Sequence, residues 1–148
     1  MTILLICTGN TCRSPMAEAI ALSMIAGGGV SVSSAGLSAP DGAPASPNSL
    51  KCAKSLGLSL ENHRARSLTR EIADKADLIL TMTTAHKAYI LETCAAADDK
   101  TYTISEYCGE SKDISDPYNL DYAAYEQCAR ELARLLKTAS EKWNSGKI

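Results

Sequence analysis

The chain of 148 residues has no run of basic residues, no acidic tail and no long apolar stretch. Its 15 basic and 17 acidic residues are interleaved and leave a formal net charge of -2, so no cationic footprint for nucleic acid is present. The apolar segment Ile3–Ile6 is too short for a membrane span or for the core of a signal peptide. We therefore predict a cytoplasmic protein that binds neither nucleic acid nor a membrane.

Close cysteine pairs are also missing. Successive cysteines lie 5, 40, 42, 14 and 20 positions apart, and only two histidines are present, which disfavours a structural zinc site. A disulfide framework would need a secreted and usually smaller chain. We therefore expect reduced thiols and no metal or other cofactor; the cysteines are Cys7, Cys12, Cys52, Cys94, Cys108 and Cys128.

The chain contains no internal repeat, linker or low-complexity tract, and its length suits one domain. A hydrophobic content of 45% is enough for an ordinary packed core. We predict one domain over residues 1–148 and a monomeric protein.

Short apolar or β-branched segments alternate with segments of helical periodicity. Strands are predicted at Ile3–Ile6, Val30–Ala35, Leu78–Leu80 and Thr101–Ile104, with the second at an edge. Helices are predicted at Pro15–Met24, Pro47–Leu56, after Thr69, at Thr84–Ala96 and at Asp121–Trp143, with Ser14, Ser46 and Thr69 as N-caps. Tyr107–Leu120 is predicted as a polar loop. This order predicts an α/β fold with a mostly parallel sheet covered by helices on both faces.

The segment Cys7–Ser14 connects the first predicted strand to the first predicted helix, where ligands often bind in such folds. A tight loop that leads into a helix start points backbone N–H groups at an anion. Gly9 is expected to permit the backbone conformation that closes the loop, and Arg13 can grip two oxygens of a phosphoryl group. The predicted phosphate-binding residues are Thr8, Gly9, Asn10, Thr11, Cys12, Arg13 and Ser14.

Cys7 is the candidate nucleophile because the helix start, the loop N–H groups and Arg13 all favour a thiolate. The Ser14 hydroxyl can donate to that thiolate and assist the breakdown of a phosphocysteine. In the alternative interpretation, Cys7 is a buried structural thiol and Arg13 a surface residue. The position of the C-x5-R-S pattern after an apolar strand disfavours that alternative.

A leaving group needs a proton, so a carboxylic acid is expected elsewhere in the chain. Asp116 is the best candidate because Pro117 stiffens the loop and favours an extended backbone before it. Asp113 is the second candidate. The residues predict a two-step reaction in which Cys7 attacks phosphorus and Asp116 first protonates the leaving group and then assists water.

The segment Cys7–Pro15, followed by Met16-Ala17-Glu18, resembles the signature of the low-molecular-weight protein tyrosine phosphatase family. Asp116-Pro117-Tyr118 resembles the general-acid loop of that family, and the resemblance spans nearly the whole chain. It implies a four-stranded parallel sheet, with Cys7 as nucleophile, Arg13 as phosphate binder and Asp116 as acid. It also implies that Asn10 braces the loop and that Cys12 forms a reversible disulfide with Cys7, which protects the nucleophile from over-oxidation.

Thr11 departs from the aliphatic residue of the usual tyrosine phosphatase pattern and resembles the protein-arginine phosphatases of the same family. A hydroxyl suits the N–H donors of a guanidinium, whereas an aliphatic wall suits an aromatic ring. Thr11 could also simply support the loop. Tyr118 is expected to line the entrance and to pack on either leaving group. The following segment Asn119–Ala124 lacks glycine, so the resemblance does not fix the shape of this rim.

Three alternatives to a protein-arginine phosphatase stay open: a protein-tyrosine phosphatase, a thioredoxin-coupled arsenate reductase and a non-catalytic phosphate-binding module. An arsenate reductase would need two further cysteines close in sequence, whereas Cys94 and Cys108 are far apart. The presence of both Cys7 and Asp116 disfavours a non-catalytic module. The expected partners are phosphorylated proteins.

Overall fold

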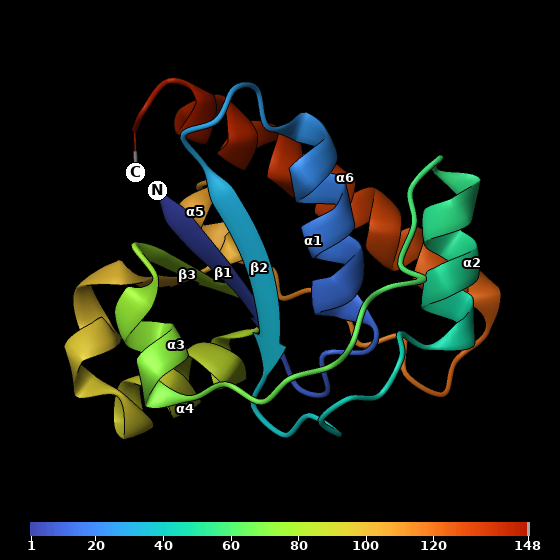
Figure 1. Ribbon diagram of the computed structural model, residues 1–148, viewed down its shortest axis with the longest axis horizontal. Coiled ribbons are helices and arrows are strands. Elements are labelled where there is room, and N and C mark those ends of the chain that lie inside the picture. The colour runs from blue at the N-terminus through green and yellow to red at the C-terminus, as the bar shows by residue number, and fades with distance from the viewer. Residues whose placement is uncertain (148) are drawn as a thin grey trace.

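Four parallel strands form one sheet in the order β2-β1-β3-β4 (Figure 1). The computed structural model describes residues 1–147, and its strands are β1 (Thr2–Cys7), β2 (Ser31–Gly36), β3 (Leu78–Thr81) and β4 (Thr101–Thr103). Every neighbouring pair of strands is parallel. The predicted α/β fold with a four-stranded parallel sheet is confirmed, as is the edge position of β2.

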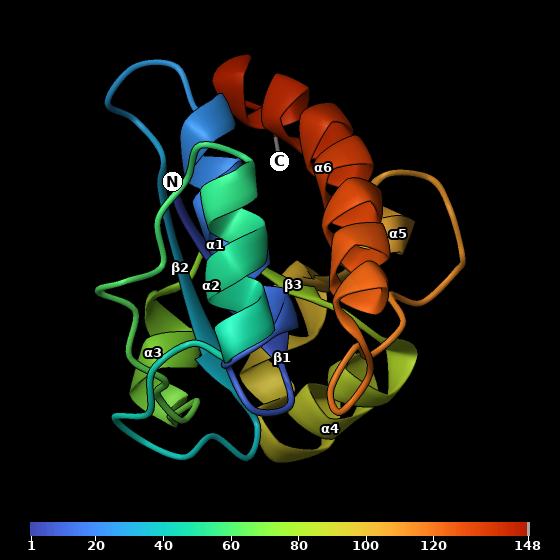
Figure 2. The ribbon, with the colours of Figure 1, turned by 90° about the vertical axis from the view of Figure 1, so that its right-hand side faces the viewer.

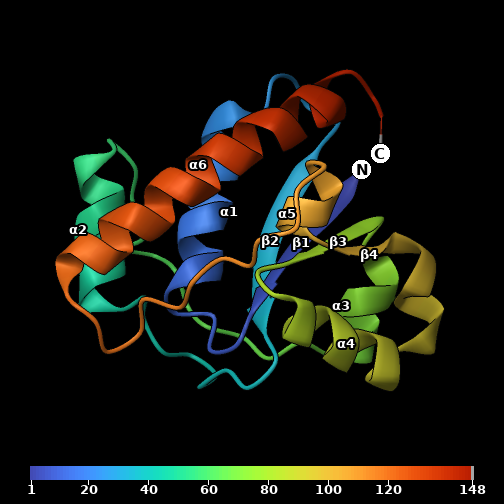
Figure 3. The same cartoon turned by 180° about the vertical axis from the view of Figure 1, so that it is seen from behind.

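Helices cover both faces of the sheet. The first face is covered by α1 (Arg13–Met24), α2 (Pro47–Ser55), α5 (Ile104–Tyr107) and α6 (Tyr122–Asn144), and Figure 3 shows α6 lying across α1. The second face carries α3 (Arg70–Lys75), α4 (Thr84–Thr93) and a 3-10 helix, η1 (Ala95–Lys100). Within β1, Ile3 and Leu5 pack into the core of the first face, and Leu4 and Ile6 pack into that of the second. This two-residue alternation explains why the segment Ile3–Ile6 is apolar at every position.

Two of the three predicted helix caps are confirmed. Ser46 accepts from the backbone N–H of Ser49 at the start of α2, and Thr69 accepts from that of Ile72 at the start of α3. The prediction for Ser14 is wrong, because α1 begins at Arg13 and its N-cap residue, Cys12, makes no side-chain cap bond. The Ser14 hydroxyl instead contacts the thiol of Cys7, 2.9 Å away.

The chain after β3 differs from the prediction at two places. The helix α4 ends at Thr93, and the last residues predicted for it belong to the 3-10 helix η1. Ile104 starts the short helix α5 instead of ending a strand, because Thr103 and Glu106 form a reciprocal capping box there. In residues 1–147, no helix combines the length and the apolar character needed to cross a bilayer.

Two loops meet beyond the C-terminal ends of the central strands. Figure 2 shows the loop that follows β1 and the loop that precedes α6 at the same end of the molecule, close to α4. We call them the phosphate loop (residues 7–14) and the acid loop (residues 113–121). The sheet therefore brings together two segments that are about a hundred positions apart in the sequence.

Candidate active site

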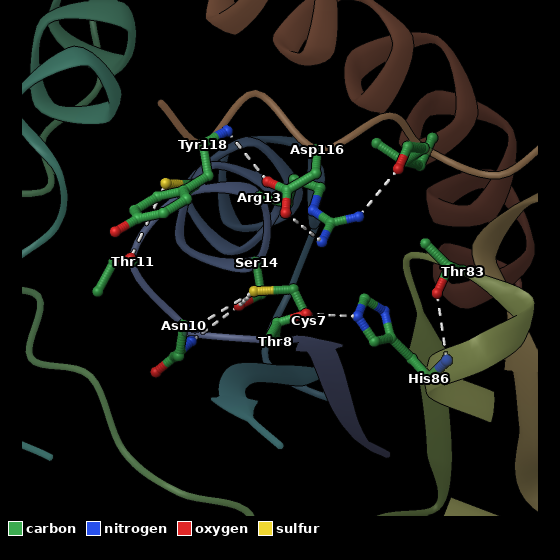
Figure 4. A network of polar contacts seen from close by, with 12 residues as sticks. Cys7, Thr8, Asn10, Thr11, Arg13, Ser14, Thr83, His86, Asp116 and Tyr118 are labelled. Atoms are coloured by element: carbon green, nitrogen blue, oxygen red, sulfur yellow. Dashed lines mark hydrogen bonds and ion pairs between the residues drawn. The ribbon is translucent and has the colours of Figure 1, made fainter. Parts of the chain in front are cut away.

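Cys7 is the last residue of β1 and the first of the phosphate loop, and its thiol is buried. Its Sγ atom receives the backbone N–H of Asn10 at 3.3 Å and lies 2.9 Å from Ser14 Oγ. Asn10 Nδ2 donates to the same Ser14 oxygen at 2.8 Å, which leaves the Ser14 hydroxyl hydrogen free to point at the sulfur (Figure 4). Two donors directed at one sulfur can stabilise the negative charge that it carries as a nucleophile or a leaving group.

The left-handed residue of the phosphate loop is Asn10, with a φ of 54°. The prediction that Gly9 supplies the special backbone conformation is therefore wrong. Gly9 does not have a positive φ, and a Cβ there would meet Thr11 Oγ1 at an ordinary 3.6 Å. Asparagine tolerates the left-handed region better than most residues, and the fully buried Asn10 is held by bonds from its side chain to Ser14, Ser34 and Arg66.

The end of β2 supports the phosphate loop from behind. A Cβ on Gly36 would lie 2.6 Å from the carbonyl oxygen of Thr8 and 3.0 Å from the nitrogen of Asn10, so only glycine fits without a shift of the loop. The same Thr8 carbonyl accepts from the N–H of Ser38 at 2.9 Å. His63 Nε2 adds a 2.7 Å contact to the carbonyl of Asn10.

Arg13 joins the two loops. One end of its guanidinium donates to the carbonyl of Ile114 at 2.9 Å, and the other lies 3.3 Å from Asp116 Oδ2 (Figure 4). The Arg13 side chain is only 4% exposed, whereas that of Asp116 is 50% exposed. The second Asp116 oxygen accepts from the N–H of Tyr118 at 3.1 Å. A buried cation and a half-exposed carboxylate thus share one side of the site.

Asp113, the second candidate acid, has a different place. Its carboxylate accepts from the backbone N–H of Thr84 at 3.0 Å and lies 3.2 Å from the Thr84 hydroxyl, at the start of α4. The structure therefore brings Asp116, and not Asp113, against Arg13.

A cavity of about 240 Å³ opens between the two loops. Most of the predicted site residues line it, while Asn10 and Ser14 are buried beneath it. Ser38 and Pro40, from the segment after β2, complete the wall and carried no signal in the sequence. The lining residues are Cys7, Thr8, Gly9, Thr11, Cys12, Arg13, Ser38, Pro40, Asp116 and Tyr118.

Cys12 also reaches this cavity, and its environment differs from that of Cys7. Its Sγ lies 3.4 Å from the hydroxyl of Tyr125 and 3.5 Å from that of Ser46. Burial raises the pKa of Tyr125 to about 12, so this hydroxyl keeps its proton. Both Cys7 and Cys12 are free thiols in the structure.

His86 is a contact of the phosphate loop that the sequence did not reveal. Its Nε2 lies 2.8 Å from Thr8 Oγ1, and the side chain is 7% exposed. Burial, followed by the charge of Arg13, lowers the pKa of His86 to about 4. A histidine in the first turn of a helix after β3 gives no sequence signal for contact with a loop near the N-terminus.

A buried thiol, a loop at a helix start, a buried arginine and an adjacent carboxylate can bind a tetrahedral oxyanion and transfer it to sulfur. On this fold, that combination defines the class of cysteine-dependent phosphatases. Residues 2–145 match the family described as "Low molecular weight phosphotyrosine protein phosphatase", and the chain belongs to it.

Similar proteins in this family carry two kinds of name. The chain is 38% identical to "Protein-arginine-phosphatase" of Bacillus subtilis, over 96% of each chain. It is also 38% identical to "Probable low molecular weight protein-tyrosine-phosphatase EpsP" of Ralstonia nicotianae, over 90% of this chain and 89% of that one. A solved structure of "YwlE arginine phosphatase - C7S mutant with phosphorylated active site serine" aligns with a TM-score of 0.91 at 35% identity, covering 96% of this chain and 95% of that one.

Proposed function

We propose that this protein removes phosphoryl groups from phosphoarginine in proteins, with Cys7 as the nucleophile. The observation that carries the proposal is the Cys7 thiol at the base of a cavity lined by Arg13 and Asp116, with two donors aimed at its sulfur. The solved C7S mutant of the relative, with its phosphorylated active site serine, supports a covalent phosphoenzyme at this loop.

In the first step, the Cys7 thiolate attacks phosphorus and forms a P–S bond as the bond to the leaving nitrogen or oxygen breaks. Arg13 and the N–H groups of the phosphate loop stabilise the charge on the phosphoryl oxygens. Asp116 protonates the leaving group, and its half-exposed side chain can reach a substrate at the cavity mouth. The transferred proton completes the N–H bond of a leaving arginine, which departs as a guanidinium, or the O–H bond of a leaving tyrosine, which departs as a neutral phenol.

In the second step, water attacks the phosphocysteine and the P–S bond breaks. The Asp116 carboxylate, now deprotonated, accepts a proton from that water. The Ser14 hydroxyl, 2.9 Å from the sulfur, stabilises the thiolate that leaves. Inorganic phosphate is released and the Cys7 thiolate is regenerated.

Phosphoarginine as the substrate is supported by the side chains around the leaving group. Thr11 and Asp116 line the cavity and can accept hydrogen bonds from guanidinium N–H groups. The Tyr118 ring, 62% exposed at the rim, can pack on a guanidinium. The similarity to the Bacillus subtilis protein named as a protein-arginine phosphatase points the same way.

Phosphotyrosine is the second candidate substrate, because Tyr118 can equally stack on a phenyl ring and one relative is named as a probable tyrosine phosphatase. An arsenate reductase is disfavoured by the fold. Cys94 packs against the core on one face of the sheet and Cys108 against the core on the other, so the two cannot relay a disulfide together.

We further propose a monomeric enzyme of the cytoplasm that acts on phosphorylated proteins. Six free thiols suit a reducing compartment.

Cys12 is proposed to protect the nucleophile. A peroxide could oxidise the Cys7 thiolate to a sulfenic acid, and the Cys12 thiol could displace water from it to form a disulfide. That both thiols line one cavity supports this protective reaction.

The specificity is tested by measuring kcat/KM on one protein carrying phosphoarginine and on one carrying phosphotyrosine. The wild type is compared with Thr11→Ile, which builds an aliphatic wall, and with Thr11→Val, which removes only the hydroxyl. We expect a preference for phosphoarginine that falls in both variants. An unchanged preference would remove Thr11 from the account, and a wild type that prefers phosphotyrosine would contradict the proposed substrate.

A further inference from the structure

The start of α4 contacts both catalytic loops. His86 Nε2 lies 2.8 Å from the Thr8 hydroxyl of the phosphate loop. Two positions earlier on the helix, Thr84 donates its N–H to Asp113 of the acid loop at 3.0 Å, and their side chains approach to 3.2 Å. One turn of helix therefore holds a residue from each loop.

These contacts complete a closed ring. The acid loop is joined to the phosphate loop by Arg13, which donates to the carbonyl of Ile114 and pairs with Asp116. The phosphate loop is joined to α4 by Thr8 and His86, and α4 is joined to the acid loop by Thr84 and Asp113. A ring of three links fixes the relative position of the loops better than the single link through Arg13 would.

His86 is held as a neutral, buried hydrogen-bonding group. Its backbone N–H is fixed by the Thr83 side chain at 3.1 Å, and its Nδ1 atom has no partner within residues 1–147. We assign the ring proton to Nε2, which then donates to the Thr8 hydroxyl and leaves Nδ1 as an acceptor that is unpaired among the described residues. Burial and the nearby Arg13 keep the ring uncharged at neutral pH, against the opposing pull of Asp116 and Asp113.

We propose that His86 is a positioning residue: through the Thr8 hydroxyl it ties the phosphate loop to α4 and so keeps Asp116 aligned with the leaving group held above Cys7. The inference rests on the proposed phosphatase function. The contacts of Cys7 with Ser14 and Asn10 do not involve His86, so attack by sulfur should survive its loss. Protonation of the leaving group by Asp116 should become less efficient without His86, because it depends on the distance between the two loops.

The test measures kcat/KM, which reports the first chemical step, for a series of aryl phosphates whose phenols differ in acidity. His86→Phe fills the space without donating, and His86→Gln retains a donor. We expect His86→Phe to slow phenyl phosphate at least about tenfold and para-nitrophenyl phosphate less than about threefold, because only the poorer leaving group needs the acid. His86→Gln should restore most of the loss, and Tyr89→Ala, at a 48% exposed position on the same helix, should match the wild type.

Thr8→Val removes the same hydrogen bond from the other side and keeps the test informative if His86→Phe fails to fold. It should give the same steeper dependence of kcat/KM on the leaving group. If both single variants fold, the double variant Thr8→Val/His86→Phe should lose no more kcat/KM than either single variant, because both remove the same hydrogen bond. An equal loss for all aryl phosphates, without rescue by His86→Gln, would overturn the positioning role. A wild type without activity on any aryl phosphate and on a protein carrying phosphoarginine would instead contradict the proposed function itself.

Discussion

The phosphate loop and the acid loop, to which the proposed mechanism assigns the nucleophile and the acid, differ in how their backbones are held. Each contains one asparagine in the left-handed region: Asn10 with a φ of 54° and Asn119 with a φ of 61°. Asn10 is fully buried, and its side chain bonds to Ser14 within the loop and to Ser34 and Arg66 outside it, whereas Asn119 is exposed. The same backbone conformation is thus held by buried side-chain hydrogen bonds in the phosphate loop and lies exposed at the surface in the acid loop.

The difference teaches where the enzyme needs rigidity. Arg13 and Ser14 are buried and must be in place before a phosphoryl group arrives, because preorganised donors lose no free energy in reorienting. Asp116 and Tyr118 are exposed at the cavity, where the proposed mechanism places the leaving group of a protein substrate. We infer that the phosphate loop determines the chemistry and that the exposed part of the acid loop from Tyr118 onward adapts to the substrate.

Among the substitutions that test this comparison of the two loops, Arg13→Lys should have the largest effect, because a lysine cannot grip two oxygens and hold Ile114 at the same time. We expect kcat/KM for para-nitrophenyl phosphate to fall by about 10³-fold. Steady-state kinetics with Arg134→Lys, a surface position, as the control would measure it. If Arg13→Lys loses less than tenfold more kcat/KM than the control, the fixed guanidinium is not needed and the comparison of the two loops is contradicted.

Asp116→Asn should have the next largest effect, and one that depends on the substrate. We expect phenyl phosphate to lose about 10²-fold in kcat/KM and para-nitrophenyl phosphate much less, since general acid catalysis matters most for poor leaving groups. Asp121→Asn, which keeps an N-cap at the start of α6, is the matched control. Equal losses on both substrates would place Asp116 with the phosphate-binding residues instead.

Gly36→Ala tests whether the phosphate loop is locked from behind. The new Cβ would lie 2.6 Å from the Thr8 carbonyl, so the loop must shift. We expect the free energy of unfolding to fall by about 1–3 kcal/mol and inorganic phosphate to bind more weakly. Denaturant melts and phosphate inhibition would show both, against Gly28→Ala, where nothing lies within 4 Å of the new atom. An unchanged inhibition constant would mean that the loop tolerates the shift.

The smallest expected effect is a pH dependence of stability that comes from His86. The pKa of this residue falls from 6.5 to about 4 on folding. Between pH 4 and pH 6.5, His86 therefore binds a proton in the unfolded chain but not in the folded protein. Stability is therefore fully present above pH 6.5 and declines as the pH falls toward 4. We expect wild type to lose roughly 1–2 kcal/mol more than His86→Gln over this window. Parallel pH profiles of the two proteins in denaturant melts would contradict the buried neutral state.

The same comparison explains what the sequence could predict. The phosphate loop is contiguous between a strand and a helix, so Cys7, Arg13 and the anion site could be predicted from local pattern. Which residue takes the left-handed conformation could not, because glycine and asparagine stand next to each other at positions 9 and 10 and both tolerate it. Ser14 has the pattern of an N-cap, but its hydroxyl is used by the buried thiol.

The contacts between remote segments were beyond sequence reasoning. His86 and Ser38 reach the phosphate loop only because β3 and β2 flank β1 in the sheet, and neither carries a local pattern. The short helix α5 is different, since Thr103 and Glu106 have the spacing of a capping box and could have been recognised. In the sequence, only the following proline favours Asp116 over Asp113 as the acid. In the structure, Asp116 pairs with Arg13, whereas Asp113 accepts from the backbone N–H of Thr84.

The most direct test of the account locates the phosphoryl group during turnover. The wild type would be mixed with a phosphorylated protein, quenched by denaturation within milliseconds and digested, and its peptides examined by mass spectrometry. The account predicts a phosphoryl group on the sulfur of Cys7 that disappears as substrate is exhausted, and Cys7→Ser should turn over substrate at least about 10⁴-fold more slowly. Turnover that continues in Cys7→Ser, or a phosphoryl group on a different residue, would contradict it.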